Sequence, residues 1–354
     1  MSETAENLIV NDCQKVLSHY PNDFLTNLRN QCILITGGTG FIGTWLAELL
    51  TFLNDKEQYN MKIVLLSERA YTFASKAPHL VNRQDITLIS KDIVGVTDLP
   101  AEITMIIHAA GSPDNRLHAS DPIKVMRTIT MGTEVLLSIA SRLPKLKKIL
   151  NISSGLIYGN QNTHSEKSKE CGGNCPESFS FNNAYVEAKR YAESLCAVYG
   201  NKYKLDITNI RPYAFVGPYQ LVDRPWAINN FIRDYLNNKP IRILGDGETV
   251  RSYMYPADMA LWILKLLADA NAGQSYNIGN PAPISLNSLA EKISLSMHKN
   301  LPVQINNYQD NAYRRTRFVP DVTKAFNELD LKITVEIDEA LEHTLLWNLS
   351  NYCK

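Results

Sequence analysis

Short apolar runs alternate with longer segments of helical period through the middle of the chain. Residues such as Ile, Val and Leu dominate continuous runs at 32–36, 62–66, 86–90, 102–110, 147–153 and 205–212. Segments with apolar residues every three or four positions follow several of them, at 41–53, 123–143 and 182–200, and a polar helix is expected after the second run. Because parallel strands buried on both faces are uninterrupted apolar runs separated by helices, the pattern predicts βαβ repetition around a parallel sheet.

A glycine-rich turn joins the first of these strands to the first helix. Its glycines have G-x-x-G-x-x-G spacing, which permits a tight turn, close approach of the backbone to a pyrophosphate at the helix N-terminus, and close packing of helix on strand. A purely structural turn is the alternative, but the flanking strand and helix favour a dinucleotide site. The residues expected to contact the cofactor here are Gly37, Gly40, Phe41, Ile42 and Gly43.

The two ends of the chain depart from the repetition. An amphipathic stretch followed by Pro21 predicts an N-terminal helical extension over 1–30, lying on the first lobe. After residue 211 the period becomes less regular and Pro and Gly become frequent, until two more helical segments at 285–297 and 336–350. We therefore expect an α/β fold. A Rossmann-type, doubly wound parallel sheet at 31–210 would bind NAD(P), and a smaller C-terminal α/β substrate-binding lobe at 211–354 would be partly interleaved with it.

Charged residues after the second and third strands bear on the choice of cofactor. Glu68 could accept hydrogen bonds from the adenine-ribose hydroxyls of NAD, whereas Arg69 could pair with the extra phosphate of NADP. NAD and NADP both stay open, with NAD preferred. Asp92 and Ile93 follow the third strand, where an adenine amino group could be met, and a strand-end cap is the alternative for Asp92.

A tyrosine and a lysine in the third long helix are the catalytic candidates. Tyr185 and Lys189 are four residues apart, so they share one face of a helix, one turn apart. A free tyrosine has a pKa of ~10, and bringing it near pH 7 requires roughly 4 kcal/mol of stabilisation of the phenolate, which a neighbouring ammonium and a cationic nicotinamide ring could supply. Tyr185 could then act as general base or acid.

Ser154 follows the fifth strand, at the end where the ligand crevice of a parallel sheet lies. It could therefore bind the reacting oxygen; a turn cap is the alternative.

Composition and charge narrow the classes of partner. The 354 residues carry 36 Lys+Arg against 36 Asp+Glu, a formal net charge of +0. This balance gives no electrostatic footprint for nucleic acid or an anionic membrane, and no uncharged apolar run reaches the ~20 residues of a membrane span. The N-terminus lacks a basic segment followed by an apolar one. We expect a cytoplasmic protein that binds neither nucleic acid nor membrane.

Cysteine usage predicts thiols and no metal site. Six Cys in a chain of this length are too sparse for a secreted disulfide scaffold. Cys171 and Cys175 could form half of a metal site or a loop disulfide, but no second pair completes a tetrahedral set and His164 is isolated. We interpret this stretch as a loop.

Taken together, these residues resemble a known family, the extended short-chain dehydrogenases/reductases, in their NAD-dependent epimerase/dehydratase group acting on nucleotide sugars. The likeness covers nearly everything from residue 31 to the C-terminal helix. Besides TGGTGFIG at 36–43, it includes Asp92-Ile93, His108-Ala109-Ala110, Asp121-Pro122, Gly132-Thr133, Ser153-Ser154 with Tyr158-Gly159, Tyr185 with Lys189, Arg211-Pro212, Val216-Gly217-Pro218, Gly245-Asp246-Gly247 with Arg251, Tyr255, Asp258, and Tyr276-Asn277-Ile278-Gly279.

The resemblance implies roles for several of these residues. It makes Ser154, Tyr185 and Lys189 a catalytic trio, with Lys189 also holding the nicotinamide ribose. It implies cofactor contacts at Ala109 and Ala110, a contact of Arg251 with the substrate diphosphate, and a homodimer packed through helices that include 185–199. The run Arg314-Arg315-x-Arg317 could share the diphosphate, since guanidinium forks bind phosphates bidentately; a solvated basic face is the alternative.

Departures from the family pattern narrow the expected activity. The sugar-nucleotide 4,6-dehydratases typically carry Asp-Glu after the active-site hydroxyl, and the related decarboxylases carry Glu at the second place. Here the two residues are Gly155 and Leu156, and leucine cannot move a proton. Ile129 and Ala214 stand where the family often has Asn, and the loop between Tyr158 and Tyr185 is long for the family.

The resulting hypothesis is an epimerase of a nucleotide-diphosphate sugar that transfers a hydride transiently to bound NAD(P). An NADPH-dependent 4-keto-6-deoxy nucleotide-sugar reductase, serving deoxysugar or O-antigen biosynthesis, is the first alternative. A 4,6-dehydratase or a UDP-glucuronate decarboxylase is less favoured because of Leu156. A non-catalytic dinucleotide sensor is the least favoured, because the chain retains Tyr185 and Lys189.

Overall fold

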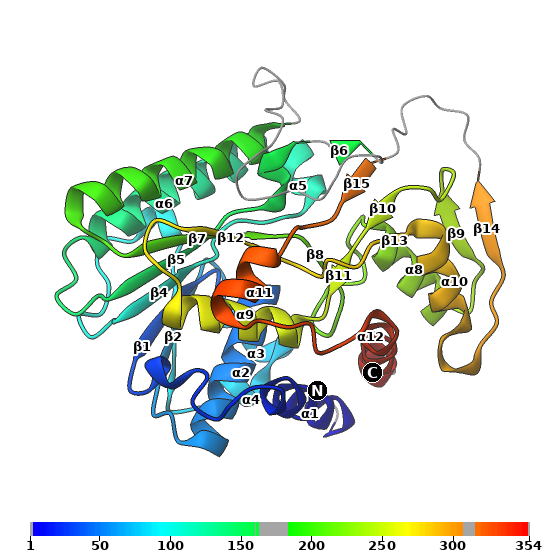
Figure 1. The fold of residues 1–354 in the computed structure, drawn as a ribbon, viewed down its shortest axis with the longest axis horizontal. Helices are drawn as coiled ribbons and strands as arrows, with labels where there is room; N and C mark the ends of the chain where they lie inside the picture. Colours follow the sequence, from blue (N-terminus) through cyan, green and yellow to red (C-terminus); the bar gives the residue numbers. More distant parts are fainter. Residues whose placement is uncertain (1–2, 160, 163–182, 307–315, 353–354) are drawn as a thin grey trace.

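A seven-stranded parallel sheet forms the centre of the molecule (Figure 1). The computed structural model describes residues 3–159, 161–162, 183–306 and 316–352. In sheet order the strands are β12 (Ser275–Ile278), β7 (Ile207–Pro212), β5 (Lys148–Ile152), β4 (Met105–His108), β1 (Cys32–Thr36), β2 (Lys62–Ser67) and β3 (Ile86–Ser90). The chain runs outward from β1 to β3, then returns to β4 beside β1. The predicted doubly wound sheet is confirmed, and its switch point lies between β1 and β4.

Helices cover both faces of this sheet. Figure 1 shows α6 (Pro122–Ala140) and α7 (Ala184–Tyr203) on one face, and α2 (Phe41–Glu57) and α9 (Pro256–Asp269) on the other. Alternate residues of β1 serve the two layers: Ile33 and Ile35 belong to the core around α2 and α9, and Leu34 to the core under α6 and α7. Both faces are therefore buried, which explains the uninterrupted apolar strands of the sequence.

The connection between β2 and β3 differs from the single polar helix expected there. It consists of the 3-10 turn η2 (Ala70–Thr72) and two four-residue helices, α3 (Phe73–Lys76) and α4 (Pro78–Val81). Proline disfavours helical backbone at the preceding residue, and Ala77 accordingly has φ −141° and ψ 69°. Pro78 therefore divides the segment and turns Lys76 back towards α2.

The second half of the chain builds smaller sheets and helices beside the main sheet. A four-stranded sheet has the order β13 (Ile284–Ser285), β10 (Val250–Arg251), β15 (Thr316–Phe318) and β6 (Gln161–Asn162), and two-stranded sheets pair β11 (Tyr253–Met254) with β8 (Ala214–Phe215) and β14 (Val303–Asn306) with β9 (Ile241–Leu244). The helices of this half are α8 (Ala227–Leu236), α10 (Leu286–Leu295), α11 (Thr323–Leu329) and α12 (Ile337–Tyr352), with the 3-10 turn η6 (Ser296–His298). Strand β12 returns from this half to the edge of the main sheet.

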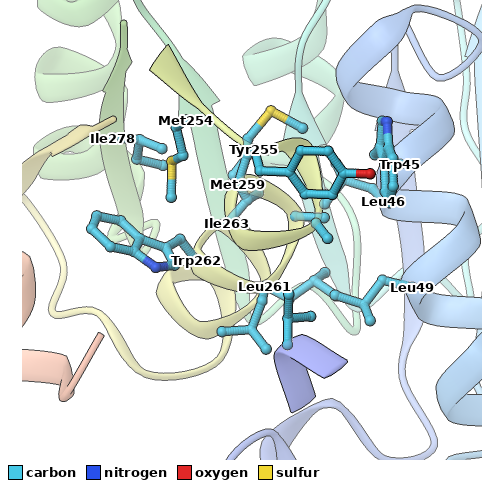
Figure 2. Packing of buried hydrophobic residues seen from close by; sticks show 14 of the residues in the cluster. Trp45, Leu46, Leu49, Met254, Tyr255, Met259, Leu261, Trp262, Ile263 and Ile278 are labelled. Atoms are coloured by element: carbon cyan, nitrogen blue, oxygen red, sulfur yellow. The ribbon is translucent and has the colours of Figure 1, made fainter. Parts of the chain in front are cut away.

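The N-terminal helix is part of the main core. Helix α1 (Glu3–Ser18) packs against α2, α9 and α12, and the short turn η1 (Thr26–Leu28) lies against α9. Its buried Asp12 accepts a hydrogen bond from the Tyr255 hydroxyl and lies 2.9 Å from Nδ1 of His343. Figure 2 shows the neighbouring core, where Tyr255 and Trp45 meet between α9 and α2. Helix α1 thus contacts both halves of the chain.

Two features of the described residues bear on the expected partners. Within the part of the chain that the structure describes, no helix is long and apolar enough to cross a membrane. Among the same residues, no cluster of three or more His, Cys, Asp and Glu side chains has the arrangement of a metal site. Cys171, Cys175 and His164 lie outside the described residues.

Candidate cofactor and catalytic site

The glycine turn after β1 has the geometry that an anionic pyrophosphate requires. Gly37 has φ +67°, and a Cβ there would lie 2.6 Å from the carbonyl oxygen of Ala109 at the end of β4. A Cβ on Gly43 would overlap the backbone of Gly38. Gly40 precedes α2 and offers no capping side chain to the first-turn N–H groups, to which Phe41 and Ile42 belong. The turn therefore fits the dinucleotide expected from the sequence, with the positive end of α2 facing the ligand.

A buried hydrogen-bond chain fixes the floor of this site. The His108 ring lies between two hydroxyls, with Nδ1 2.7 Å from Thr36 Oγ1 and Nε2 3.0 Å from Thr133 Oγ1. Thr133 donates to the Ile129 carbonyl and therefore accepts from His108 Nε2–H. Burial lowers the pKa of His108 to about 3, and the charge of Lys189 adds to the effect. A neutral histidine thus ties β1, β4 and α6 together beneath Ala110, whose N–H bonds Thr36 Oγ1 at 3.2 Å.

The adenosine end of the predicted site lies at the ends of β2 and β3. Glu68 faces Lys124 at the start of α6, 3.5 Å away, and both side chains are about half exposed. Asp92 accepts a hydrogen bond from Val94 N, so it caps the short turn η3 (Ile93–Gly95), as the alternative interpretation allowed. Arg69 follows Glu68 at the same edge. The structure therefore brings all the predicted adenosine residues to one edge, and the choice between NAD and NADP stays a prediction.

Ser154, Tyr185 and Lys189 come together beside the glycine turn. All three are buried: Ser154 follows β5, and the other two share one face of α7. Ser154 hydrogen-bonds Tyr185, and the ammonium of Lys189 lies 5.9 Å from the centre of the Tyr185 ring. A Cβ on Gly111, two residues after Ala109, would lie 3.7 Å from Lys189 Nζ. The trio therefore stands at the carboxyl ends of β4 and β5, where a ligand crevice is expected.

The expected lowering of the Tyr185 pKa depends on the positive nicotinamide ring as well as on Lys189, and the side chains of this trio alone do not produce it. Burial raises the pKa of Tyr185 to about 12, and the hydrogen bond from Ser154 opposes this rise. Burial also lowers the pKa of Lys189 to about 8, against the charges of Glu193 and Cys196. Lys189 donates to the Ile152 carbonyl at 2.7 Å, and this contact holds its amine against β5. Without cofactor, therefore, Tyr185 is protonated at neutral pH.

A histidine that the sequence analysis missed covers Tyr185, the candidate catalytic tyrosine. His118, in α5 (Asn115–Ser120), stacks on Tyr185 with ring centres 4.4 Å apart and an angle of 18° between the planes. Its Nε2 lies 2.7 Å from the Ser112 carbonyl, which can only accept, so that nitrogen carries the proton. A cavity of about 260 Å³ adjoins both rings. No motif marks His118 in the sequence, because it meets Tyr185 only through the tertiary packing of α5, which lies against α6.

The loop after β5 is held by hydrogen bonds to three other elements. It forms the 3-10 turn η4 (Gly155–Tyr158), whose Tyr158 hydroxyl accepts from Arg211 and donates to Asn277 at 2.9 Å. Arg211 also forms a bidentate ion pair with Glu193 of α7. These residues carried the resemblance in the sequence. Their structural effect is to fix the position of Ser154.

The two positions after Ser154, where dehydratases are expected to carry an acid and a base, are apolar in this chain. A Cβ on Gly155 would lie 2.6 Å from the ring of Tyr213, which stacks on Phe318 of β15. Leu156 is 42% exposed, and its N–H donates to Ser154 Oγ at 3.1 Å. Next to the Ser154 hydroxyl, therefore, the chain presents an aliphatic side chain where dehydratases and decarboxylases are expected to carry an acid.

The predicted diphosphate residues lie on neighbouring strands of the small sheet. Arg251 in β10 and Arg317 in β15 belong to strands that pair in parallel. Arg251 donates to the Thr316 carbonyl at 3.1 Å and to the Thr316 hydroxyl at 2.9 Å, both neutral acceptors. Burial lowers the pKa of Arg251 from its ordinary value, and Tyr253 opposes this. Arg314 and Arg315 lie outside the described residues.

Comparisons with known proteins identify the family of this chain. A model of the NAD dependent epimerase/dehydratase family matches residues 33–279. UDP-glucuronic acid decarboxylase 1 of Xenopus tropicalis is 27% identical over 329 residues, which cover 92% of this chain and 74% of that protein. UDP-glucuronic acid decarboxylase 6 of Arabidopsis thaliana is 27% identical over 320 residues, 90% of this chain and 88% of that protein.

Solved structures share the fold over the same length. UDP-N-acetylglucosamine 4-epimerase from Methanobrevibacter ruminantium superposes with a TM-score of 0.77 at 21% identity, over 91% of this chain and 99% of that one. UDP-glucuronic acid 4-epimerase from Bacillus cereus, solved with UDP-glucuronic acid and NAD, gives 0.74 at 24%, over 92% and 100%. The expected fold, enzyme class and NAD(P) cofactor are confirmed, because the chain belongs to the NAD dependent epimerase/dehydratase family.

Proposed function

We propose that this enzyme is a nucleotide-sugar epimerase that inverts a carbinol carbon through a transient ketone. The observation that carries the proposal is the trio Ser154, Tyr185 and Lys189, buried beside the glycine turn, with Leu156 in place of a proton carrier. Epimerisation by this route needs one proton carrier at the reacting oxygen. Elimination of water needs a further acid and base, for which Gly155 and Leu156 provide no groups.

Each member of the trio has a distinct part in the proposed reaction. Bound NAD(P) would accept a hydride from the substrate carbon and return it to the opposite face. Tyr185 would take the hydroxyl proton in the first half and give it back in the second. Its pKa of about 12 keeps it protonated at neutral pH, so it could act as a base only with additional positive charge nearby, which would lower that pKa. Ser154 would hold the oxygen, and Lys189 would hold the nicotinamide ribose.

Two features support a nucleotide-diphosphate sugar as the substrate. Arg251 holds its guanidinium on neutral oxygens of Thr316, so its charge remains available to an anion. Relatives of this chain act on UDP-glucuronic acid, and structural neighbours are epimerases of UDP sugars. We therefore assign the diphosphate to Arg251 and Arg317 and the sugar to the space between them and Tyr185.

Product analysis tests the proposal against both alternatives. Purified enzyme with NAD is given UDP-glucuronic acid, UDP-glucose or UDP-N-acetylglucosamine, and products are identified by NMR and mass spectrometry. We expect an equilibrium mixture of epimers with no net change in nicotinamide absorbance. Release of CO₂ with a UDP-pentose would make the protein a decarboxylase, as the similarity to such enzymes suggests. Stoichiometric loss of NADPH with a 4-keto-6-deoxy nucleotide sugar would make it a reductase.

We also propose that the enzyme is a homodimer packed through α6 and α7. The outer face of this helix pair carries the exposed apolar residues Met126, Met131, Tyr191 and Val198 around a groove. A second copy of the same face would cover them, which is the usual reason for such a patch. Sedimentation analysis of the wild type and of Val198→Glu would test this, with a shift to monomer expected for the variant.

The free, buried Cys13, Cys32 and Cys196 support a cytoplasmic location, because thiols stay reduced in the cytosol.

A further inference from the structure

Lys76 places an amine against the glycine turn from outside the expected motif. It ends α3, in the connection between β2 and β3 that Pro78 divides. Its Nζ donates to the Thr44 hydroxyl at 2.8 Å and to the carbonyls of Thr39 and Gly40 at 3.2 and 3.3 Å. These three oxygens belong to the turn and the first turn of α2. The side chain thus joins a remote segment to the N-terminus at which a pyrophosphate would bind.

Among the described residues, no carboxylate lies within ion-pair distance of the Lys76 amine, so its positive charge is not directly paired. Glu48, one turn further along α2, already accepts hydrogen bonds from the Tyr219 hydroxyl and from His79, 2.8 Å away. The Tyr219 ring lies 5.5 Å from the amine, and the charge of Arg224 acts on it from the loop before α8. The ammonium is therefore surrounded by neutral oxygens, one shared carboxylate and another cation.

We propose that Lys76 is a cofactor-binding determinant, whose ammonium attracts the pyrophosphate through the first turn of α2 and holds the Thr39–Gly40 backbone in the binding conformation. A positive charge beside the helix N-terminus adds to the attraction of the helix dipole for an anion. Thr39 also donates its hydroxyl to Ser67 at the end of β2, so the turn is held on the adenosine side as well. Lys76 is thus a positioning residue that also contributes charge. The inference rests on the cofactor of the family and not on the epimerase reaction.

The environment of Lys76 makes this contribution dependent on pH. Burial lowers the pKa of Lys76 to about 8, Glu48 opposes this and Arg224 adds to it. A bound pyrophosphate would raise that pKa, because it favours the charged amine. By linkage, the affinity for the pyrophosphate ligand is highest below the pKa that Lys76 has in the cofactor-free protein. As the pH rises through this pKa the affinity falls, by at most about tenfold per pH unit, until the pH reaches the pKa of Lys76 in the complex.

The ligand used to test the proposal must not contact Lys189, a second lysine that titrates in the same pH range as Lys76. Burial also lowers the pKa of Lys189 to about 8, and this residue is expected at the nicotinamide ribose. ADP carries the adenosine and the pyrophosphate but no nicotinamide ribose, so it reports on the Lys76 side alone. Titration calorimetry of ADP into the full-length protein, freed of nucleotide, at about pH 7 and about pH 9 therefore measures the proposed effect.

Two substitutions at position 76 separate charge from structure. We expect the wild type to lose about tenfold in ADP affinity between the two pH values, and Lys76→Arg to keep its affinity at both, because arginine stays protonated. Lys76→Met should bind about tenfold more weakly at about pH 7 and show no fall. Lys62→Met, at the opposite end of β2, is the matched control and should behave as the wild type.

The outcomes decide the proposal without knowledge of the sugar. If Lys76→Arg loses affinity with pH as steeply as the wild type, another group titrates and the proposal fails. If Lys76→Met binds ADP as tightly as the wild type at about pH 7, the ammonium contributes nothing. Should Lys76→Met fold poorly, the comparison of Lys76→Arg with the wild type still tests the charge. An enzyme inactive on every sugar offered would refute the epimerase proposal and leave this test unchanged.

Discussion

The two ends of the crevice are built on different principles. At the cofactor end, close backbone packing decides the geometry: Gly37 lies against Ala109, and His108 is saturated by Thr36 and Thr133. At the substrate end, individual side chains decide it, with Arg251 on neutral oxygens and an exposed Leu156 beside Ser154. The difference teaches that the cofactor end tolerates few substitutions, whereas the substrate end sets specificity through a few side chains.

Removing the hydroxyl of Tyr185 should have the largest effect of these substitutions, and it should lower turnover without changing cofactor binding. We expect Tyr185→Phe to lower turnover by about 10³-fold, because the reacting oxygen loses its only proposed proton carrier. NADH affinity, measured by fluorescence titration, should stay within about twofold of the wild type, since the glycine turn is untouched. Substrate turnover close to that of the wild type would refute the assignment of Tyr185. The Tyr191→Phe variant, on the exposed side of α7, is the control.

Removing the guanidinium from β10 should act at the substrate end alone. We expect Arg251→Ala to weaken binding of UDP by about 10- to 100-fold, because a charge-assisted pair with phosphate is lost, and to leave NADH binding unchanged. Thr316→Val is the matched control: it removes the side-chain partner of Arg251 but keeps the charge. Calorimetry with UDP measures both variants. Equal losses in UDP and NADH affinity would show that Arg251 supports the whole crevice.

Mild acid should weaken the cofactor end through His108. Its pKa is about 3 in the folded protein against about 6.5 when unfolded, so the unfolded chain binds the extra proton first. Stability is therefore complete above about pH 6.5 and falls below it by up to about 1.4 kcal/mol per pH unit. Urea midpoints between about pH 7 and 5 should show this slope reduced in His108→Gln. An unchanged slope in the variant would refute the assignment to His108; His79 and His343 cannot replace it, because their raised pKa values stabilise the folded protein as the pH falls.

The ring over Tyr185 should have the smallest effect. Stacked aromatic pairs contribute about 0.5–1.5 kcal/mol, so His118→Ala should lower turnover by about 2- to 10-fold. His118→Phe keeps the stacking and loses only the bond to Ser112, so it should recover most of the loss. Initial rates of epimerisation across pH measure the three proteins. If phenylalanine is as poor as alanine, the hydrogen bond and not the ring holds Tyr185.

Much of the fold could be predicted because its signals are local. The apolar runs gave every strand of the main sheet except β12, whose Ser275–Ile278 segment is short and far along the chain. Helix α9 was missed because it lies in the part of the chain after residue 211 that was interpreted as irregular, although most of its residues are apolar and buried in the core. The division of the β2–β3 connection at Pro78 was a signal present in the sequence and left unused.

The candidate site could be predicted only where spacing alone defines it. Gly37, Gly40 and Gly43 depend on one turn, and Tyr185 with Lys189 on one helix, so their proximity follows from local geometry. The pairing of Lys189 with the Ile152 carbonyl, the stacking of His118 and the reach of Lys76 arise between distant segments. The pKa of Tyr185 in turn depends on burial and on Ser154, which local spacing does not define, and its expected lowering beside a bound cofactor stays a prediction.

The position of α1 has a practical consequence for anyone trimming this enzyme. A chain shortened to begin at residue 31, where the likeness to the family starts, would lose Asp12 and leave the Tyr255 hydroxyl and the His343 ring without their shared acceptor. It would also expose to water the surfaces of α2, α9 and α12 that α1 contacts. Deletions that remove α1 should therefore reduce solubility and yield even though α1 carries none of the proposed catalytic residues.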